Sequence, residues 1–261
     1  MKILVVITTA FTSTGGLTTV MMNYYRAMNK EGLKIDFAST NVPSQSLLDE
    51  IHVEGSEYYQ LPPRKKIVSY FYRLRRLCKN YDLLHVHGNS STSVLELMAA
   101  NWAGVKRRIV HNHTSRSQHP WINLLLHPFF LMSYTKAIAR SDAAGEWLFG
   151  NKQYQILRNA IKVSCFHYDV SVRQQIRQLL GISDSTFLVG HVGKFMDAKN
   201  HPFVIAVFAE IHRLIPNSKL LLVGDGPLRG MVETAVKNLH VEDCVISVSY
   251  THLRAHETSA H

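Results

Sequence analysis

The feature of this sequence that most restricts its fold is a repeated order of apolar strand, glycine turn and amphipathic helix. Lys2–Ile7 is a continuous apolar run, which is typical of a parallel strand buried on both faces. Two glycines follow, and the apolar residues from Leu17 to Met28 recur with the period of a helix. Leu33–Ala38 has the character of the next strand. This alternation predicts an α/β fold with a doubly wound parallel sheet and right-handed crossovers.

The same order continues along the chain and divides it into two domains. Within residues 1–158, further strands are predicted at Leu83–Val86, Arg108–His111 and Ala137–Ala139, and helices at Val94–Trp102 and Trp121–Met132. A second unit is predicted from residue 159, with strands at Phe187–Val192 and Lys219–Val223 and a helix at Pro202–Ile215. The interpretation is therefore two Rossmann-like domains, residues 1–158 and 159–246.

The end of the chain departs from this order. The turn Gly224-Asp225-Gly226 is predicted to lead into a helix with Pro227 at its first position, where a missing N–H is tolerated. Two strand–helix units leave a sheet edge and an apolar face uncovered, so the second domain is expected to be incomplete. Residues 247–261 show no apolar periodicity and are interpreted as a non-native tail.

The composition argues against several classes of protein. Hydrophobic residues make up 46% of the chain and charged residues 18%, which indicates a folded and not a disordered chain. Three cysteines without a C-x-x-C pair favour a reducing compartment over a disulfide framework or a zinc ribbon. No secretion signal is recognised, and the most apolar stretch is interrupted by His127 and Pro128. The expected location is the cytoplasm, with the protein either soluble or peripheral to a membrane.

The net charge of +10 is concentrated in the first domain. Residues 1–170 contain 20 of the 29 Lys and Arg but only 11 of the 19 Asp and Glu. Basic residues at 64–66 and 73–79 flank three consecutive aromatic residues, which favours an anionic membrane surface or an anionic substrate. A solvated helix face is the alternative. Nucleic acid is disfavoured because no nucleic-acid-binding motif accompanies the charge.

Three turns could hold an anionic ligand. Gly15-Gly16 follows the first strand, where free backbone N–H groups at a helix start face a ligand, but it is not the G-x-G-x-x-G pattern of dinucleotide binders. In Gly193–His201, two lysines can neutralise the charge that develops on a leaving diphosphate. The chain has no D-x-D pair to hold a divalent metal for that task. Gly224–Pro227 could shape a nucleotide pocket or form a simple tight turn, and the turn is favoured.

Two H-x-H pairs, His85/His87 and His111/His113, lie at predicted strands. Residues two apart on a strand share a face, so each pair could bind a metal or line a cleft. No acidic residue or cysteine stands at ligand spacing, so cleft lining is favoured and no metal ligand is assigned.

Taken together, these segments resemble glycosyltransferase family 4, especially its bacterial capsular and exopolysaccharide branch. The motifs that carry the resemblance occur in the family's order, from residue 1 to about residue 246: GGLTTVMMNYYRAM, YDLLHVHG, RIVHNHTS, SDAAGEWLFG with ILRNAI, VGHVGKFMDAKNH and LLLVGDGPLR. The resemblance implies a GT-B fold, in which two facing Rossmann-like domains hold the active site between them.

The resemblance also implies the reaction. It is that of a retaining, hexosyltransferase-type enzyme, which moves a sugar from a nucleotide-sugar donor, expected to be a UDP-sugar, without a metal or other cofactor. The implied acceptor is a glycan or a polyprenyl-diphosphate-linked glycan in cell-surface polysaccharide synthesis, and the leaving diphosphate assists the incoming hydroxyl.

In the first domain, the resemblance assigns a catalytic role to His113, which matches the family's histidine near the sugar and the acceptor hydroxyl, with His111 as the other candidate. His87 and Gly88 match a loop on the acceptor side. The residues that would lie at the donor phosphates and sugar are Gly15, Gly16 and Leu17.

In the second domain, the resemblance assigns the diphosphate to Lys194, which stands where the family more often has arginine, and to Lys199. The other donor-side residues are Asn159 at the interdomain hinge, Gly193 and Asn200 in the lysine loop, and Gly224, Asp225, Gly226 and Pro227 at the base and ribose. Replacing arginine by lysine gives up a bidentate contact, so a weaker grip on phosphate is expected.

One departure from the family concerns activity. The acidic E-x(7)-E segment and the final helix of the family are not found in this sequence, so the chain is interpreted as truncated at its C-terminus and is expected to have little transferase activity. Two alternatives remain: a metal-dependent hydrolase that uses the H-x-H pairs, and a non-catalytic fragment that binds a nucleotide or a membrane.

Overall fold

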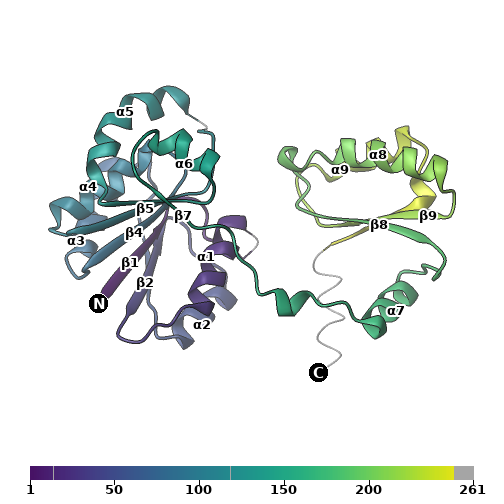
Figure 1. Ribbon diagram of the computed structural model, residues 1–261, viewed down its shortest axis with the longest axis horizontal. Helices are drawn as coiled ribbons and strands as arrows, with labels where there is room; N and C mark the ends of the chain where they lie inside the picture. The colour runs from purple at the N-terminus through teal and green to yellow at the C-terminus, as the bar shows by residue number, and fades with distance from the viewer. Residues whose placement is uncertain (14, 118, 250–261) are drawn as a thin grey trace. The chain divides into compact units, whose positions relative to one another are not determined.

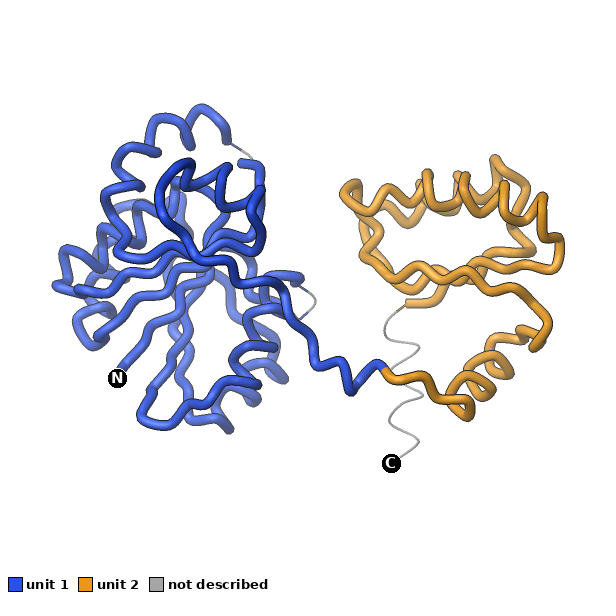
Figure 2. The backbone as a smooth tube through the Cα atoms, in the orientation of Figure 1, with its two compact units in different colours: residues 1–166 blue, residues 167–261 orange. Residues whose placement is uncertain are grey.

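A computed structural model describes residues 1–13, 15–117 and 119–249 of the chain. The chain divides into two compact units, residues 1–166 and 167–261 (Figure 2). This boundary falls later than residue 158 because the segment around Asn159 remains bonded to the first unit: the Tyr24 hydroxyl donates to the carbonyl of Arg158, and Asn23 Nδ2 donates to that of Ala160 at 2.9 Å.

Unit 1 is built on a parallel sheet of seven strands (Figure 1). The strands are β1 (Lys2–Ile7), β2 (Lys34–Ser39), β3 (Tyr58–Gln60), β4 (Leu83–Gly88), β5 (Arg107–Asn112), β6 (Lys136–Ala139) and β7 (Gln155–Ile156). The helices are α1 (Gly16–Ala27), α2 (Gln45–Val53), α3 (Ile67–Cys78), α4 (Val94–Trp102), α5 (Pro120–Ser133) and α6 (Asp142–Phe149). The order β3-β2-β1-β4-β5-β6-β7 reverses direction between β1 and β4, the point at which open α/β sheets bind ligands.

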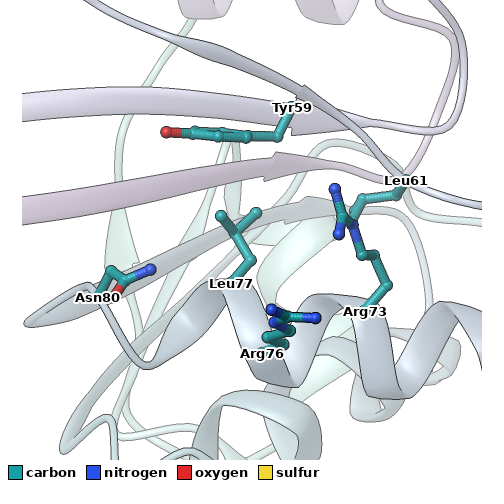
Figure 3. A pocket seen from close by; sticks show the side chains of 6 residues that line it. All are labelled: Tyr59, Leu61, Arg73, Arg76, Leu77 and Asn80. Atoms are coloured by element: carbon teal, nitrogen blue, oxygen red, sulfur yellow. The ribbon is translucent and has the colours of Figure 1, made fainter.

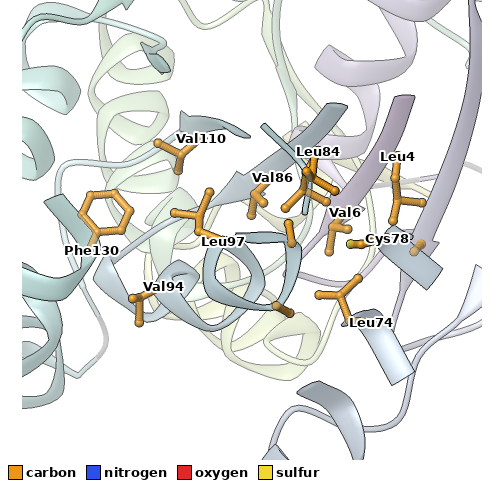
Figure 4. Close-up of a cluster of buried hydrophobic side chains, with 14 of the residues drawn as sticks. Leu4, Val6, Leu74, Cys78, Leu84, Val86, Val94, Leu97, Val110 and Phe130 are labelled. Carbon is orange, nitrogen blue, oxygen red and sulfur yellow. The ribbon is translucent and has the colours of Figure 1, made fainter. Parts of the chain in front are cut away.

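Each face of this sheet is covered by its own hydrophobic core. The alternation of side chains along a strand sends Leu4 and Val6 of β1 to the face covered by α3, α4, α5 and α6, where they join one buried cluster (Figure 4). Val5 and Ile7 point to the opposite face and pack with residues of α1 and α2. Burial on both faces explains why β1 is apolar without interruption.

Unit 2 contains a smaller parallel sheet. Its strands, in the order β10-β9-β8, are β8 (Phe187–Val192), β9 (Ser218–Val223) and β10 (Val245–Val248), and its helices are α7 (Val170–Leu179), α8 (His201–Leu214) and α9 (Arg229–Asn238). Residues from β9, α8 and α9 form its core. Ser247 and Val248, which were assigned to the tail, belong to β10, and residues 250–261 of that tail lie outside the described residues.

The predicted start of the last helix was wrong. Pro227 and Leu228 form a turn, and α9 begins at Arg229. The reason is that the Leu228 N–H donates to the carbonyl of Phe195 at 3.2 Å, which fixes the chain in a turn before the helix can start.

Among the described residues, no helix is both long enough and apolar enough to cross a bilayer.

Candidate functional site

Four histidines meet at the carboxyl edge of the unit 1 sheet. In the strand register, His87 of β4 lies beside His111 of β5 and beside Ile7 of β1. His85 shares the face of His87, and His113 follows the end of β5 on the side of His111. Because neighbouring parallel strands keep their side chains in step, the two H-x-H pairs form one cluster and not two separate pairs.

The four imidazole rings are in close contact. His87 Nδ1 and His113 Nε2 are 2.9 Å apart, a hydrogen-bond distance. The ring centroids of His85 and His87 are 4.4 Å apart and those of His111 and His113 4.1 Å apart. One ring nitrogen from each of His85, His87 and His111 lies within 4.8 Å of those of the other two.

Burial keeps these rings neutral. Desolvation lowers the pKa of His85 to about 4, that of His111 to about 2 and that of His113 to about 4. The same cause lowers the pKa of His87 well below its ordinary value, and the neighbouring histidines lower it further. At neutral pH the cluster therefore offers unprotonated nitrogens that can accept a hydrogen bond or bind a metal.

Several of these nitrogens are buried without a hydrogen-bond partner among the described residues. They are Nε2 of His85 and both Nδ1 and Nε2 of His111. A buried polar group left unsatisfied costs about 1–3 kcal/mol, so the cluster carries binding capacity that the rest of unit 1 does not use.

The loop after β1 lies next to this cluster. The Thr8 N–H and hydroxyl both donate to the carbonyl of His87, at 3.1 and 3.0 Å, and so join the ends of β1 and β4 at the sheet reversal. Gly15 caps α1, and a Cβ there would lie 3.0 Å from Thr12 Oγ1. A Cβ on Gly16 would meet nothing within 4 Å, so this first residue of the helix borders open space. Leu17 is half-buried against the core under α1.

Two residues at the ends of β4 and β5 have structural reasons for their identity. A Cβ on Gly88 would lie 2.1 Å from Ser93 Oγ, so glycine is required for the chain to pass. Asn112, which the sequence did not single out, is fully buried and donates from Nδ2 to the carbonyls of Thr114 at 2.8 Å and Ala144 at 2.7 Å. Asn112 thereby holds the turn that carries His113. The one feature of the sequence that could have pointed to Asn112 is its place between His111 and His113.

Asn159 is exposed and lies outside the strands and helices. The two bonds from α1 described above flank it, so α1 fixes the backbone on both sides of this residue.

The lysine loop of unit 2 brings together the residues predicted to hold a diphosphate. It runs from Gly193 through a short turn, Asp197–Lys199, to Asn200, which adopts the left-handed conformation that asparagine tolerates (φ 46°) and caps α8. Gly193 directly precedes Lys194, and a Cβ added to Gly193 would lie 3.5 Å from the side-chain stem of Lys199. Both lysines are exposed, and neither has an ion-pair or hydrogen-bond partner in the described part of the chain.

The second glycine turn of unit 2 packs against this loop. The Phe195 N–H donates to the carbonyl of Asp225 at 3.0 Å. A Cβ on Gly224 would lie 2.0 Å from the Gly193 carbonyl oxygen, and one on Gly226 would lie 2.4 Å from that of Phe195. The close approach of the two loops therefore requires both glycines, while Asp225 and Pro227 stay exposed. Sequence reasoning missed that His201, fully buried with both ring nitrogens unpartnered, packs against Phe195 beneath the two loops.

A hollow of 230 Å³ between β3 and α3 contains none of the predicted site residues. It is lined by Tyr59, Leu61, Arg73, Arg76, Leu77 and Asn80 (Figure 3). Its arginines are exposed and belong to the basic surface of α3.

That basic surface is smaller than the sequence predicted. Arg64 is not a free surface charge: its guanidinium pairs with the fully buried carboxylate of Glu96, with Nε 2.9 Å from Oε1 and Nη2 3.1 Å from Oε2. The Tyr70 hydroxyl donates to the same carboxylate at 2.8 Å. Lys65 and Lys66 remain exposed.

Comparison with known proteins identifies the family. The sequence profile described as Glycosyltransferase Family 4 matches residues 14–148. The chain is 26% identical over 93% of its length to EpsF of Bacillus subtilis strain 168, a protein described as a glycosyltransferase, and covers 67% of it. It is 27% identical over 91% of its length to N-acetyl-alpha-D-glucosaminyl L-malate synthase of Bacillus anthracis and covers 66% of it.

A solved structure supports the same fold. Anabaena HepE, crystallised in complex with UDP, superposes with a TM-score of 0.77 at 19% identity, over 95% of this chain and 69% of HepE. The chain thus spans about two thirds of the length of these proteins, and its α/β fold is of the GT-B type. Because the profile match extends over more than half of its residues, the chain belongs to glycosyltransferase family 4.

Proposed function

We propose that this glycosyltransferase uses a UDP-sugar donor and transfers the sugar, with retention of configuration, to a glycan or lipid-linked glycan in cell-surface polysaccharide synthesis. HepE has been crystallised with UDP and with UDP-glucose, which supports a uridine nucleotide as the donor carrier. The resemblance of the motifs to the exopolysaccharide branch supports the acceptor class. The family assignment favours this transfer over a hydrolase built on the histidines.

The observation that carries the proposal is the pair of unpartnered ammonium groups on Lys194 and Lys199. Two ammonium groups on one exposed loop can both contact the same anion, whose negative charge offsets their mutual repulsion. A diphosphate supplies that anion, and each charge-assisted contact contributes about 1.5–3 kcal/mol. In this proposal the two cations do what a divalent metal does in other phosphate sites, so the diphosphate needs no metal.

The proposed reaction breaks the bond between the anomeric carbon and the β-phosphate oxygen of the donor. The acceptor oxygen bonds to the same face of that carbon, and its proton passes to an oxygen of the leaving diphosphate. Lys194 and Lys199 stabilise the charge that develops on the diphosphate.

His113 is proposed to orient the sugar or the acceptor hydroxyl. Its Nε2 is engaged with His87, so Nδ1 is the nitrogen available to substrate. Because burial lowers its pKa to about 4, the ring is neutral at pH 7 and acts as a hydrogen-bonding group, not as an acid. His111 is fully buried, which makes His113 the better candidate for substrate contact.

Measuring the affinity for UDP tests directly whether Lys194 and Lys199 bind the diphosphate. Titration calorimetry with UDP in the presence of a chelator should show binding that Lys199→Ala weakens by about 10-fold to 100-fold. Lys194→Arg should strengthen it, since arginine restores a bidentate contact. The matched control is Lys237→Ala, which removes an exposed lysine from α9 of the same unit and should change nothing. Equal affinity for Lys199→Ala and the native chain would refute this role.

A membrane surface is the proposed location of a lipid-linked acceptor. Helix α5 exposes a row of large apolar side chains, including Trp121 (82% exposed), Leu125 (72%) and Met132 (83%). Lys65 and Lys66 stand at the start of α3, and a groove lined by Ile67 of α3 and Ile122 of α5 joins the two helices. Apolar side chains beside free lysines suit an anionic bilayer.

Flotation with vesicles tests this surface. We expect binding to phosphatidylglycerol vesicles that falls at high salt, and much weaker binding to phosphatidylcholine vesicles. The pair Trp121→Ser and Leu125→Ser should reduce flotation, whereas Val53→Ser, equally exposed on α2 at the other face of the sheet, should not. If the pair floats like the native chain, α5 does not contact the bilayer.

A further inference from the structure

The histidine cluster has a capacity that the proposed transfer reaction does not use. That reaction needs one imidazole toward substrate, but four imidazoles lie in contact, and three of them each offer a ring nitrogen within 4.8 Å of the others. His111 is 1% exposed, and neither of its nitrogens has a partner among the described residues. Nε2 of His85 is also buried and unpartnered.

Hydrogen bonds within the cluster do not account for this arrangement. A neutral imidazole has one donor and one acceptor, and the only short nitrogen–nitrogen pair recorded among these four rings joins His87 to His113. His85 and His111 lie instead with their rings nearly parallel, 7° apart, at 5.8 Å between centroids. Nε2 of His85 and both nitrogens of His111 are buried without a hydrogen-bond donor or acceptor among the described residues.

We propose that His85, His87 and His111 form a binding site for one divalent transition-metal ion of the zinc type. Three neutral imidazole nitrogens plus one open position is a common coordination for Zn²⁺. Tetrahedral Zn²⁺ with bonds of about 2.0–2.1 Å requires ligand nitrogens about 3.4 Å apart, so the rings need to rotate inward only slightly from their present separation.

The donor set selects the metal. Among the described residues, the group contains three histidines and no carboxylate or thiol, which suits Zn²⁺, Cu²⁺ or Ni²⁺ and disfavours Mg²⁺, Mn²⁺ and Ca²⁺. The site lies in unit 1, whereas the lysine loop is in unit 2.

The fourth histidine, His113, would fix the orientation of the His87 ring. If His87 binds the metal through Nε2, its Nδ1–H donates to Nε2 of His113, since these two atoms are 2.9 Å apart. Metal-bound histidines usually donate their second ring N–H in this way, which fixes the tautomer. Through this hydrogen bond the ion would also hold the ring of His113 in place.

The test uses the full chain without a histidine tag, stripped with a chelator and dialysed against Zn²⁺. We expect one zinc per chain, no competition from Mg²⁺, and, with Co²⁺ in its place, the visible absorption bands of tetrahedral nitrogen coordination. His85→Gln and His111→Gln each remove one ligand and should weaken Zn²⁺ binding by at least about 100-fold.

The matched control is His201→Gln in unit 2. His201 is as buried as His111, but among residues 1–13, 15–117 and 119–249 both of its ring nitrogens are unpartnered and the one histidine ring in contact with it is that of His191. Zinc binding should survive this change. Native-like affinity in both unit 1 variants, or loss in His201→Gln, would overturn the proposal. If the unit 1 variants do not fold, the cobalt spectrum of the native chain decides, and absence of the tetrahedral bands would overturn it.

Discussion

Some glycines of this chain are required by close packing, whereas others border open space, and substitution by alanine distinguishes the two kinds. At Gly224 a Cβ would lie 2.0 Å from the Gly193 carbonyl oxygen, a backbone atom that cannot move without separating the two loops of unit 2. Gly224→Ala should therefore destabilise unit 2 by about 3 kcal/mol. At Gly16 a Cβ meets nothing within 4 Å, so Gly16→Ala should leave stability unchanged or raise it by up to about 1 kcal/mol. Urea denaturation measures both.

Donor binding by the Gly16→Ala variant shows whether the open space beside Gly16 serves packing or ligand binding. If Gly16→Ala lowers donor affinity while its stability is retained, the open space at α1 is used by a ligand. A large loss of stability in Gly16→Ala would show that this space is filled by the protein itself.

The cysteines should differ sharply in reactivity. Cys78 is 1% exposed, and burial raises the pKa of its thiol to about 12, whereas Cys165 is exposed. Because the thiolate is the reactive form, a colorimetric disulfide reagent at pH 8 should modify Cys165 rapidly and Cys78 only after unfolding. Mass spectrometry of the quenched protein identifies the labelled residue. Labelling of Cys78 at the rate of Cys165 would contradict the packing of α3.

Among the elements, α4 and the turn that precedes α3 are joined by an ion pair between Glu96 and Arg64, whose two members are not equivalent. Glu96 has 0% side-chain exposure, while Arg64 has 28% and can reach water. Arg64→Met leaves a buried carboxylate without its countercharge and should cost about 3–5 kcal/mol. Glu96→Gln leaves an arginine that can turn outward and should cost less, about 1–2 kcal/mol.

A double-mutant cycle checks this asymmetry. The chain with both Arg64→Met and Glu96→Gln should be more stable than Arg64→Met alone, because the uncompensated charge has been removed. Equal losses in the two single variants would show that the carboxylate reaches solvent.

The sequence predicted helices and strands best where the apolar residues followed a single pattern, either that of a helix or that of a buried strand. Helix α4 and strand β8 have the predicted bounds, Val94–Trp102 and Phe187–Val192. The start of α9 was missed because a long-range bond from Phe195 outweighs the local preference of proline for a first helical turn.

At the scale of the whole molecule, the candidate site could be predicted only in parts. The H-x-H spacing correctly places His85 and His87 on one face of β4, with His113 just beyond the end of β5. The pairing of His87 with His111 depends on the register between β4 and β5, which a single sequence does not encode locally. For the same reason the H-x-H spacing alone predicts two separate pairs and not one cluster of four histidines. The ion pair of Arg64 was missed because its partner, Glu96, lies 32 residues further along the chain, on α4.

The two units should respond differently to acid, because the buried histidine cluster belongs to unit 1. In unfolded chain these histidines have a pKa near 6.5, while burial lowers the pKa to about 4 for His85 and about 2 for His111. Below pH 6.5 the unfolded state therefore binds protons that the folded state does not. The stabilisation is fully present above pH 6.5 and is lost as pH falls toward 4.

Each histidine that stays neutral should lower the stability of unit 1 by about 2 kcal/mol between pH 7 and pH 5. All three tryptophans, Trp102, Trp121 and Trp147, lie in unit 1, so urea denaturation of the metal-free chain followed by tryptophan fluorescence reports this unit alone. His85→Gln should flatten the pH dependence by about one histidine's contribution, while the exposed control His52→Gln should not. A native chain whose unit 1 stability is the same at pH 7 and pH 5 would mean that the rings are hydrated, since only desolvation depresses the pKa of His85.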